Sequence, residues 1–231
     1  MKKLLLFIPL ILFTLSGCES YSWRQKLTIT VETPAGEVSA SSVSQVSWSK
    51  HWIQTDGMGW DYDVTGEAVV VEVTPGRYLF ALLKGAGTTE YMGSVAAASI
   101  AGRESRVIDG ALFDEVRDQR DRAAGVITVP DYQFPMLVTF DDIADPASVK
   151  LVDATDLATS FGPGVRLKSV TLVVIDEQVT KGVLEGVLPP AFFQRWAGDL
   201  HAAFDQGRGA EYAISLQGQY TKDDFIKGEG Q

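Results

Sequence analysis

The chain has 231 residues, of which 45% are hydrophobic and 22% charged, and its formal charge is −10 at neutral pH. The acidic balance argues against nucleic acid as a partner, because phosphate contacts need clustered lysine and arginine. The hydrophobic content is typical of a globular chain and argues against disorder. Cys18 is the only cysteine, so no internal disulfide can form.

Residues 1–17 have the features of a secretory signal peptide. Two lysines precede an apolar run at 4–15, and two small residues follow it. The run is too short to cross a bilayer, which takes about 20 helical residues, so it fits a cleaved signal. Leu15-Ser16-Gly17-Cys18 resembles the lipobox of bacterial lipoproteins. The resemblance implies that the Cys18 sulfur receives a diacylglycerol, that the chain is cut just before Cys18, and that the new amine is acylated.

The lipobox leads us to expect a lipid-anchored protein of the bacterial envelope that faces the periplasm. Cleavage before Cys18 removes 17 residues, two of them lysines, and leaves 214 residues with a formal charge of −12. That charge argues against electrostatic adsorption to anionic lipid, so we expect the acyl chains to hold the protein at the membrane. Residue 19 is Glu; by resemblance to lipoprotein sorting, an Asp there favours the inner membrane, so we expect the outer one. The alternatives are an ordinary cleaved signal and a buried cysteine in a core helix.

The first half of the mature chain predicts an antiparallel sheet. After a short tether at 18–25, apolar and polar residues alternate with the period of a half-buried strand. Pro34-Ala35-Gly36 and Thr74-Pro75-Gly76 are turn signals. The predicted strands cover residues 25–33, 37–49, 67–73 and 77–84.

The second half predicts helices mixed with further strands. The predicted helices cover 88–102, 109–125, 155–161 and 190–207, and the predicted strands cover 125–130, 134–140, 165–176 and 211–220. In the last helix, Phe193, Trp196, Leu200 and Phe204 share one face. We therefore expect an α+β fold, with an antiparallel β-rich N-terminal part (a meander or sandwich-like) and helices packed in the second half. One globular domain over 26–231 is expected, with a candidate sub-boundary near 125–134.

Two stretches of the chain resemble a family of uncharacterised small exported proteins of Gram-negative bacteria. They are "KLTITVETPAGEVSASSV" at 26–43 and residues 134–189, where the resemblance is carried by "TFDDIADPASVKLVDATDLATSFGPGVRLKSVTLVVIDEQVTKGVLEGVLP". The resemblance implies exported relatives. It implies no activity, so no functional residue is carried over.

Two short motifs match catalytic or metal-binding patterns by spacing alone. Ser47-Trp48-Ser49-Lys50 has the Ser-x-x-Lys spacing of serine acyl-enzymes, but the sequence lacks their Ser-Asp-Asn and Lys-Thr-Gly companions. His201 and Asp205 lie one helical turn apart, whereas a zinc site needs at least three protein ligands. The sequence therefore predicts no catalytic residue, no metal site and no cofactor.

Asp141, Asp142 and Asp145 crowd one predicted loop. Carboxylate oxygens are calcium ligands, but the spacing differs from that of a dedicated calcium loop. Asp145-Pro146 fits a turn or a helix cap with Pro at the first helical position. Asp141 and Asp142 are also the acids that an envelope hydrolase without histidine would use, provided that their environments separate their pKa values.

The densest aromatic segment of the chain contains Trp48, Trp52, Trp60 and Tyr62. Glycine and aspartate between them predict a loop, and exposed aromatic side chains there would contact a protein, a glycan or lipid headgroups. Trp52, Trp60 and Tyr62 form the candidate contact patch; the alternative is that Trp48 and Trp52 are core residues. The expected function is non-catalytic binding or scaffolding in the envelope. The alternatives are the acid-based hydrolase and a subunit of a larger envelope complex.

Overall fold

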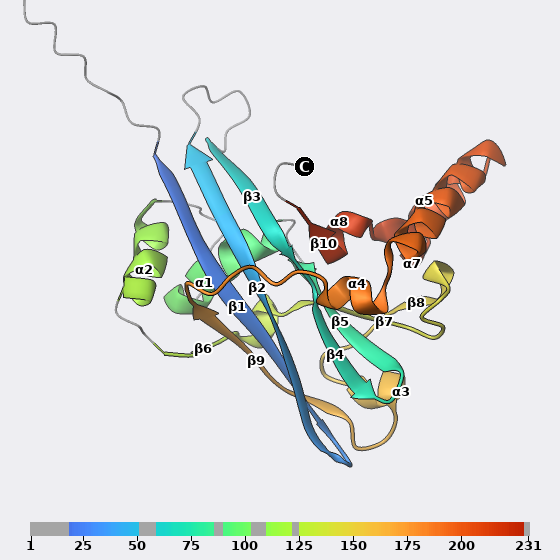
Figure 1. The fold of residues 1–231 in the computed structure, drawn as a ribbon, viewed down its shortest axis with the longest axis horizontal. Helices are drawn as coiled ribbons and strands as arrows, with labels where there is room; N and C mark the ends of the chain where they lie inside the picture. The colour runs from blue at the N-terminus through green and yellow to red at the C-terminus, as the bar shows by residue number, and fades with distance from the viewer. Residues whose placement is uncertain (1–18, 51–58, 86–89, 103–109, 122–124, 229–231) are drawn as a thin grey trace, which may run out of the picture.

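The computed structural model describes residues 19–50, 59–85, 90–102, 110–121 and 125–228. Two antiparallel sheets and a group of C-terminal helices build the fold, which confirms the α+β class (Figure 1). The six-stranded sheet has the order β10-β3-β2-β1-β9-β6 and the four-stranded sheet the order β4-β5-β7-β8. The first contains β1 (Ser20–Thr33), β2 (Gly36–Lys50), β3 (Trp60–Glu67), β6 (Ile127–Thr128), β9 (Arg166–Val174) and β10 (Ile226–Lys227). The second contains β4 (Val69–Thr74), β5 (Arg77–Gly85), β7 (Pro135–Phe140) and β8 (Val149–Leu151).

The hairpin of β1 and β2 is the longest element of the six-stranded sheet. Every second residue of β1 from Trp23 to Thr33 is buried, as the alternation in the sequence predicts. At the turn, the Thr33 hydroxyl donates to the Gly36 carbonyl at 2.8 Å, and Gly36 has a φ of +123°, a conformation that favours glycine. The strand begins at Ser20, earlier than the sequence indicates. Residues 20–25, predicted as a tether, pair in register with β2.

The chain passes from one sheet to the other at Ala68, between β3 and β4. The turn from β4 to β5 is the predicted one: Pro75 fits its first corner, and Gly76 takes the positive φ of +73° that its second corner requires. The four-stranded sheet is buried on both faces, because Leu79, Ala81 and Leu83 of β5 enter one core while Phe80 and Leu82 enter another. A strand that is buried on both faces explains the unbroken apolar run of β5.

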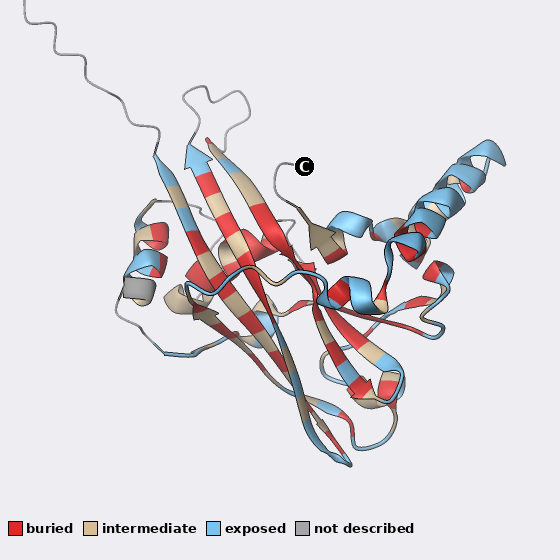
Figure 2. Cartoon of the chain, viewed as in Figure 1, coloured by how far each residue is buried: buried red, intermediate tan, exposed pale blue. Residues whose placement is uncertain are grey.

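Figure 2 shows buried residues alternating with less buried ones along β1, because one face of this strand packs on a core. The larger core lies between the two sheets and is completed by α1 (Tyr91–Ala101) and α2 (Gly110–Asp121). The smaller core lies between the four-stranded sheet and the C-terminal helices. The remaining helices are α3 (Leu157–Phe161), α4 (Val183–Val187), α5 (Pro190–Asp205), α6 (Gly209–Ile214), α7 (Leu216–Gln219) and α8 (Lys222–Phe225), with 3₁₀ turns at Asp131–Gln133 and Pro146–Ser148. Within the described ranges, no helix is long and apolar enough to span a membrane.

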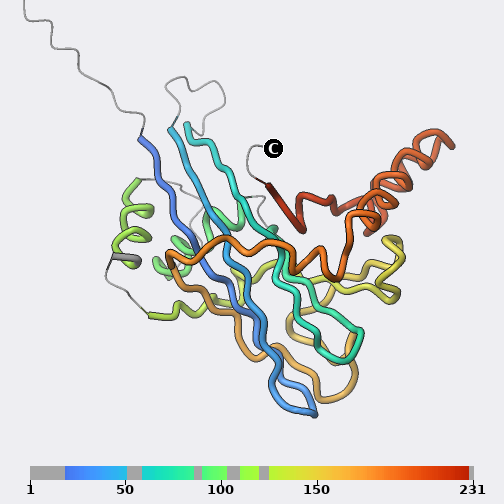
Figure 3. The backbone as a smooth tube through the Cα atoms, in the orientation of Figure 1, coloured from blue at the N-terminus to red at the C-terminus, as the bar shows by residue number. Residues whose placement is uncertain are grey.

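The prediction of a strand at 211–220 is wrong, because this segment forms α6 and α7. The Ser215 side chain accepts a hydrogen bond from the Gly218 amide and caps α7. The Trp196 indole of α5 donates to the Gln217 carbonyl at 3.0 Å. Packing against α5 therefore decides the structure of this segment, and β10 takes the edge of β3 instead (Figure 3).

Candidate functional site

The residues predicted to form sites lie in different settings. Cys18 and Trp52 lie outside the described residues. Trp60 and Tyr62 lie on β3, where Trp60 pairs with Lys50 and Tyr62 with Trp48 across the ladder to β2. The loop predicted for this segment is therefore wrong from Trp60 onward.

An aromatic cluster explains why β3 begins there. Phe113 of α2 has its ring centroid 5.3 Å from that of Trp48, 5.4 Å from that of Trp60 and 5.1 Å from that of Tyr21. Trp48 is only 2% exposed and its ring is 5.0 Å from that of Tyr62. Trp48 is thus a core residue, as the alternative interpretation holds, whereas Trp60 and Tyr62 are half-buried. Burial raises the pKa of the Tyr62 hydroxyl.

The start of β1 is fixed by both backbone and side-chain contacts. The Lys50 amide donates to the Glu19 carbonyl at 2.9 Å, and the Lys50 ammonium lies 2.9 Å from the Glu19 carboxylate. The Tyr21 hydroxyl donates to the other carboxylate oxygen at 3.0 Å. The hydrogen bond from Lys50 and then that from Tyr21 lower the pKa of Glu19. Glu19, the residue that follows Cys18 in the sequence, is thus held to the end of β2.

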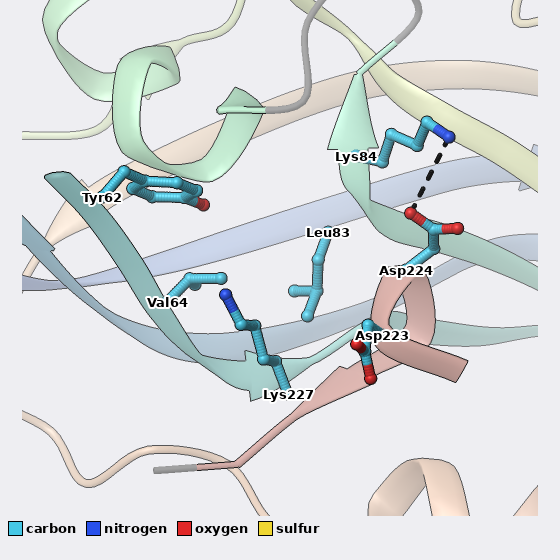
Figure 4. Close-up of a pocket in the computed structure, with 7 residues that line it drawn as sticks. All are labelled: Tyr62, Val64, Leu83, Lys84, Asp223, Asp224 and Lys227. Atoms are coloured by element: carbon cyan, nitrogen blue, oxygen red, sulfur yellow. Dashed lines mark ion pairs between the residues drawn. The ribbon is translucent and has the colours of Figure 1, made fainter. Parts of the chain in front are cut away.

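A cleft of about 190 Å³ opens between β3, β5 and the C-terminal segment (Figure 4). It is lined by Tyr62, Val64, Leu83, Lys84, Asp223, Asp224 and Lys227. The Lys84 ammonium lies 3.8 Å from the Asp224 carboxylate, and the Lys227 ammonium lies 3.3 Å from that of Asp63. Both lysines are therefore matched by carboxylates of the chain. The volume is below the roughly 300 Å³ at which pockets for drug-sized ligands begin.

The three clustered aspartates serve the local backbone. Asp145 caps the 3₁₀ turn that Pro146 begins, as the sequence predicts, with its carboxylate accepting from the Ala147 amide at 2.9 Å. Asp142 accepts from the Ala144 amide at 2.9 Å, and Asp141 forms an ion pair with Lys150 at 2.5 Å. Each carboxylate thus has a structural partner.

The other two motifs do not line the cleft between β3, β5 and the C-terminal segment. Lys50 ends β2 in contact with Glu19, while Ser47 is half-buried three residues earlier in the strand, opposite Asp63. His201 and Asp205 are exposed on α5. Across the described residues, no three His, Cys, Asp or Glu side chains are grouped as metal ligands are.

The structure also shows an exposed apolar surface that sequence reasoning missed. Phe192, Phe193 and Trp196 of α5 are buried, but Leu200 and Phe204, predicted on the same packed face, are 37% and 63% exposed. The C-terminal half of α5 extends beyond the sheet that covers its first half (Figure 2). Ile214 at the end of α6 is 79% exposed. Leu200, Phe204 and Ile214 are called the apolar tip below. Comparison with protein-family models, with curated proteins and with solved structures finds no match to this chain.

Proposed function

We propose that the chain is a lipid-anchored protein of the bacterial envelope, attached through acyl chains on Cys18, that acts in the periplasm as a non-catalytic scaffolding or binding module. The observation that supports the proposal is that β1 begins two residues after Cys18, so that an acyl anchor there would be joined directly to the sheet. Ser20 already lies in β1, and Glu19 is bound to Lys50 through its backbone and its side chain. Only the Cys18–Glu19 link separates the acylated residue from a rigid element.

A rigid connection suits a protein that presents a surface at a fixed place. β1 has 14 residues, which at about 3.3 Å per residue span about 45 Å. The turn at Gly36 therefore lies about that far from the anchor along the strand. A flexible linker would let the body turn freely, whereas this connection limits its orientation. We propose the outer membrane as the site of attachment, because residue 19 is Glu.

The hydrolase alternative has less support, because Asp141 and Asp142 are engaged in an ion pair and a turn. A subunit of a larger complex has one observation in its favour, the apolar tip, since large exposed apolar surfaces mark interaction sites. A scaffolding module and a subunit of a larger complex would differ in what covers the apolar tip.

The intact mass of the chain purified from membranes tests the anchor. We expect a wild-type polypeptide that begins at residue 18 and carries acyl mass. Cys18→Ser should carry none, because a hydroxyl is a far weaker nucleophile than a thiolate. Cell fractionation alone is ambiguous, because uncleaved precursor can stay in the membrane through residues 4–15. A wild-type chain that starts after Cys18, or starts there with a free thiol, refutes the proposal.

A further inference from the structure

The apolar tip is carried by two helices that lie side by side. Leu200 and Phe204 are four residues apart on α5 and so share a face. The Phe204 ring lies close to Gly209, and the Gln217 carbonyl accepts from the Trp196 indole, so α6 returns along α5. Three large apolar side chains are therefore exposed on one helical projection, while the first half of α5 is packed on the sheet.

This projection reaches the same edge of the molecule as the start of β1 (Figure 1). The start of β1, the end of β2 and the free end of α5 all reach the upper edge, whereas the β1–β2 turn lies at the lower edge (Figure 1). A membrane that holds Cys18 beside the start of β1 would therefore also lie beside the free end of α5.

The charges of the projection favour an apolar contact over an electrostatic one. The Asp199 carboxylate accepts from the Gln217 side chain at 2.8 Å, so it is engaged within the projection. Arg208 donates to the Gln206 side chain, and Asp205 and Glu211 are acids of the same exposed region. Basic residues thus form no excess that would bind anionic lipid. Burial of phenylalanine, leucine and isoleucine side chains in the membrane interface contributes to binding without any basic residue.

We propose that the apolar tip inserts into the interface of the bilayer that carries the Cys18 acyl chains. The inference rests on the proposed anchor. With two points of attachment, the start of β1 and the end of α5, the body has a fixed orientation. The β1–β2 turn then points into the periplasm.

The test uses the full lipidated chain in vesicles of phosphatidylethanolamine and phosphatidylglycerol that contain headgroup-proximal spin-labelled lipid. Because acylation consumes the only natural thiol, Gln206→Cys provides a single labelling site for an environment-sensitive fluorophore beside the tip. Ala35→Cys, exposed in the distal turn, is the matched control. We expect the emission of the fluorophore at position 206 to shift to the blue and to be strongly quenched by the spin-labelled lipid. The fluorophore at position 35 should show neither change. High salt should not reduce the quenching at position 206. Adding Phe204→Ser to Gln206→Cys should reduce the quenching.

The intact mass of each labelled sample separates the two proposals. Acylated protein whose probes at 206 and 35 behave alike overturns membrane contact and leaves the anchor standing. A missing acyl mass refutes the anchor and the inference together. A blue shift at 206 that depends on protein concentration and resists the lipid quencher shows that a second copy or another protein covers the tip, and it also overturns the inference.

Discussion

Glu67 is 1% exposed, and its carboxylate accepts hydrogen bonds from the three successive amides that begin α4. The Gly182 and Val183 amides lie 3.0 Å from its oxygens and the Leu184 amide 3.3 Å. First-turn amides have no partner inside a helix, and the positive end of the helix dipole favours a carboxylate there. Glu67 thus joins the end of β3 to a helix that lies more than a hundred residues later.

Replacing Glu67 should cost much of the stability that this junction provides. Glu67→Ala removes the acceptor of three amides, of which that of Leu184 belongs to a buried residue, and should lower the free energy of unfolding by about 3 kcal/mol. Glu67→Gln keeps one acceptor oxygen and should cost less. Urea unfolding followed by circular dichroism measures both. Glu72→Ala is the control, because Glu72 accepts a single amide, that of Gly76, in an exposed turn; an equal loss there would show that Glu67 has no special role.

Tyr91 is buried, and its hydroxyl has no hydrogen-bond partner among the described residues. Burial raises the pKa of Tyr91 above its usual value near 10, so the folded state resists ionisation. The stability that comes from this raised pKa is fully present below pH 10. It is lost as the pH rises above 10, because the tyrosine of the unfolded chain releases its proton before that of the folded chain. We expect the free energy of unfolding to fall above pH 10 by about 1.4 kcal/mol per pH unit for this group.

Tyr91→Phe should weaken that alkaline loss and raise the free energy of unfolding by about 1 kcal/mol at pH 7, because it removes an unpaired buried hydroxyl. Urea unfolding at a series of pH values measures both effects. Tyr132→Phe, at a side chain that is 47% exposed, is the control. Identical alkaline behaviour of Tyr91→Phe and the wild-type protein would contradict the assignment.

At the scale of elements, two glycines inside helices should respond to alanine in opposite directions. A Cβ on Gly93 of α1 would lie 2.6 Å from the Tyr62 ring and 2.7 Å from the Trp48 ring, whereas one on Gly198 of α5 would meet nothing within 4 Å. The Trp48 ring is stacked on Phe113, and its indole donates to the Gly93 carbonyl, so it has little room to move. Gly93→Ala should cost about 1–3 kcal/mol by overpacking.

Gly198→Ala should instead raise the free energy of unfolding by about 0.5–1 kcal/mol, because alanine restricts the unfolded chain and favours the helix. Thermal unfolding of both variants and of the wild-type protein measures whether each substitution raises or lowers the stability. A stabilised Gly93→Ala would show that α1 does not sit closely on β2 and β3.

The sequence predicts elements whose signals are local. The alternation of Leu27, Ile29 and Val31 matches a strand with one buried face, and Pro75 and Gly76 specify their own turn. The short helix predicted at 155–161 forms at Leu157–Phe161, with its cap supplied by the Asp156 side chain. These signals need no partner from elsewhere in the chain.

Errors arise where distant contacts decide the structure. Trp60 and Tyr62 follow a segment with loop-like composition, yet cross-strand pairing and Phe113 of α2 make them part of a strand. On α5, Leu200 and Phe204 continue the helical period of Trp196, and nothing local indicates that the supporting sheet ends before them. The apolar tip could therefore not be predicted from the sequence.

At the scale of the whole molecule, each sheet combines distant parts of the chain. β1 pairs with β9, β3 with β10 and β5 with β7, so strands from both sides of the candidate sub-boundary near 125–134 share the same ladders. The two cores occupy opposite faces of the four-stranded sheet. A chain of this size can unfold through intermediates, but here neither core can be exposed without disrupting strands that also cover the other.

We therefore predict that residues 19–231, made without the signal segment, fold in aqueous buffer and unfold in a single transition. Ile29→Ala in the larger core and Phe192→Ala in the smaller one both replace side chains with no measurable exposure. They should lower the free energy of unfolding by about 2–5 and 3–5 kcal/mol, respectively. Circular dichroism and tryptophan fluorescence should report the same midpoint for each variant. Val126→Ala, at an exposed apolar side chain, should change that midpoint little. Two separate transitions, each moved by only one of the core variants, would instead show that the cores belong to independently folding units.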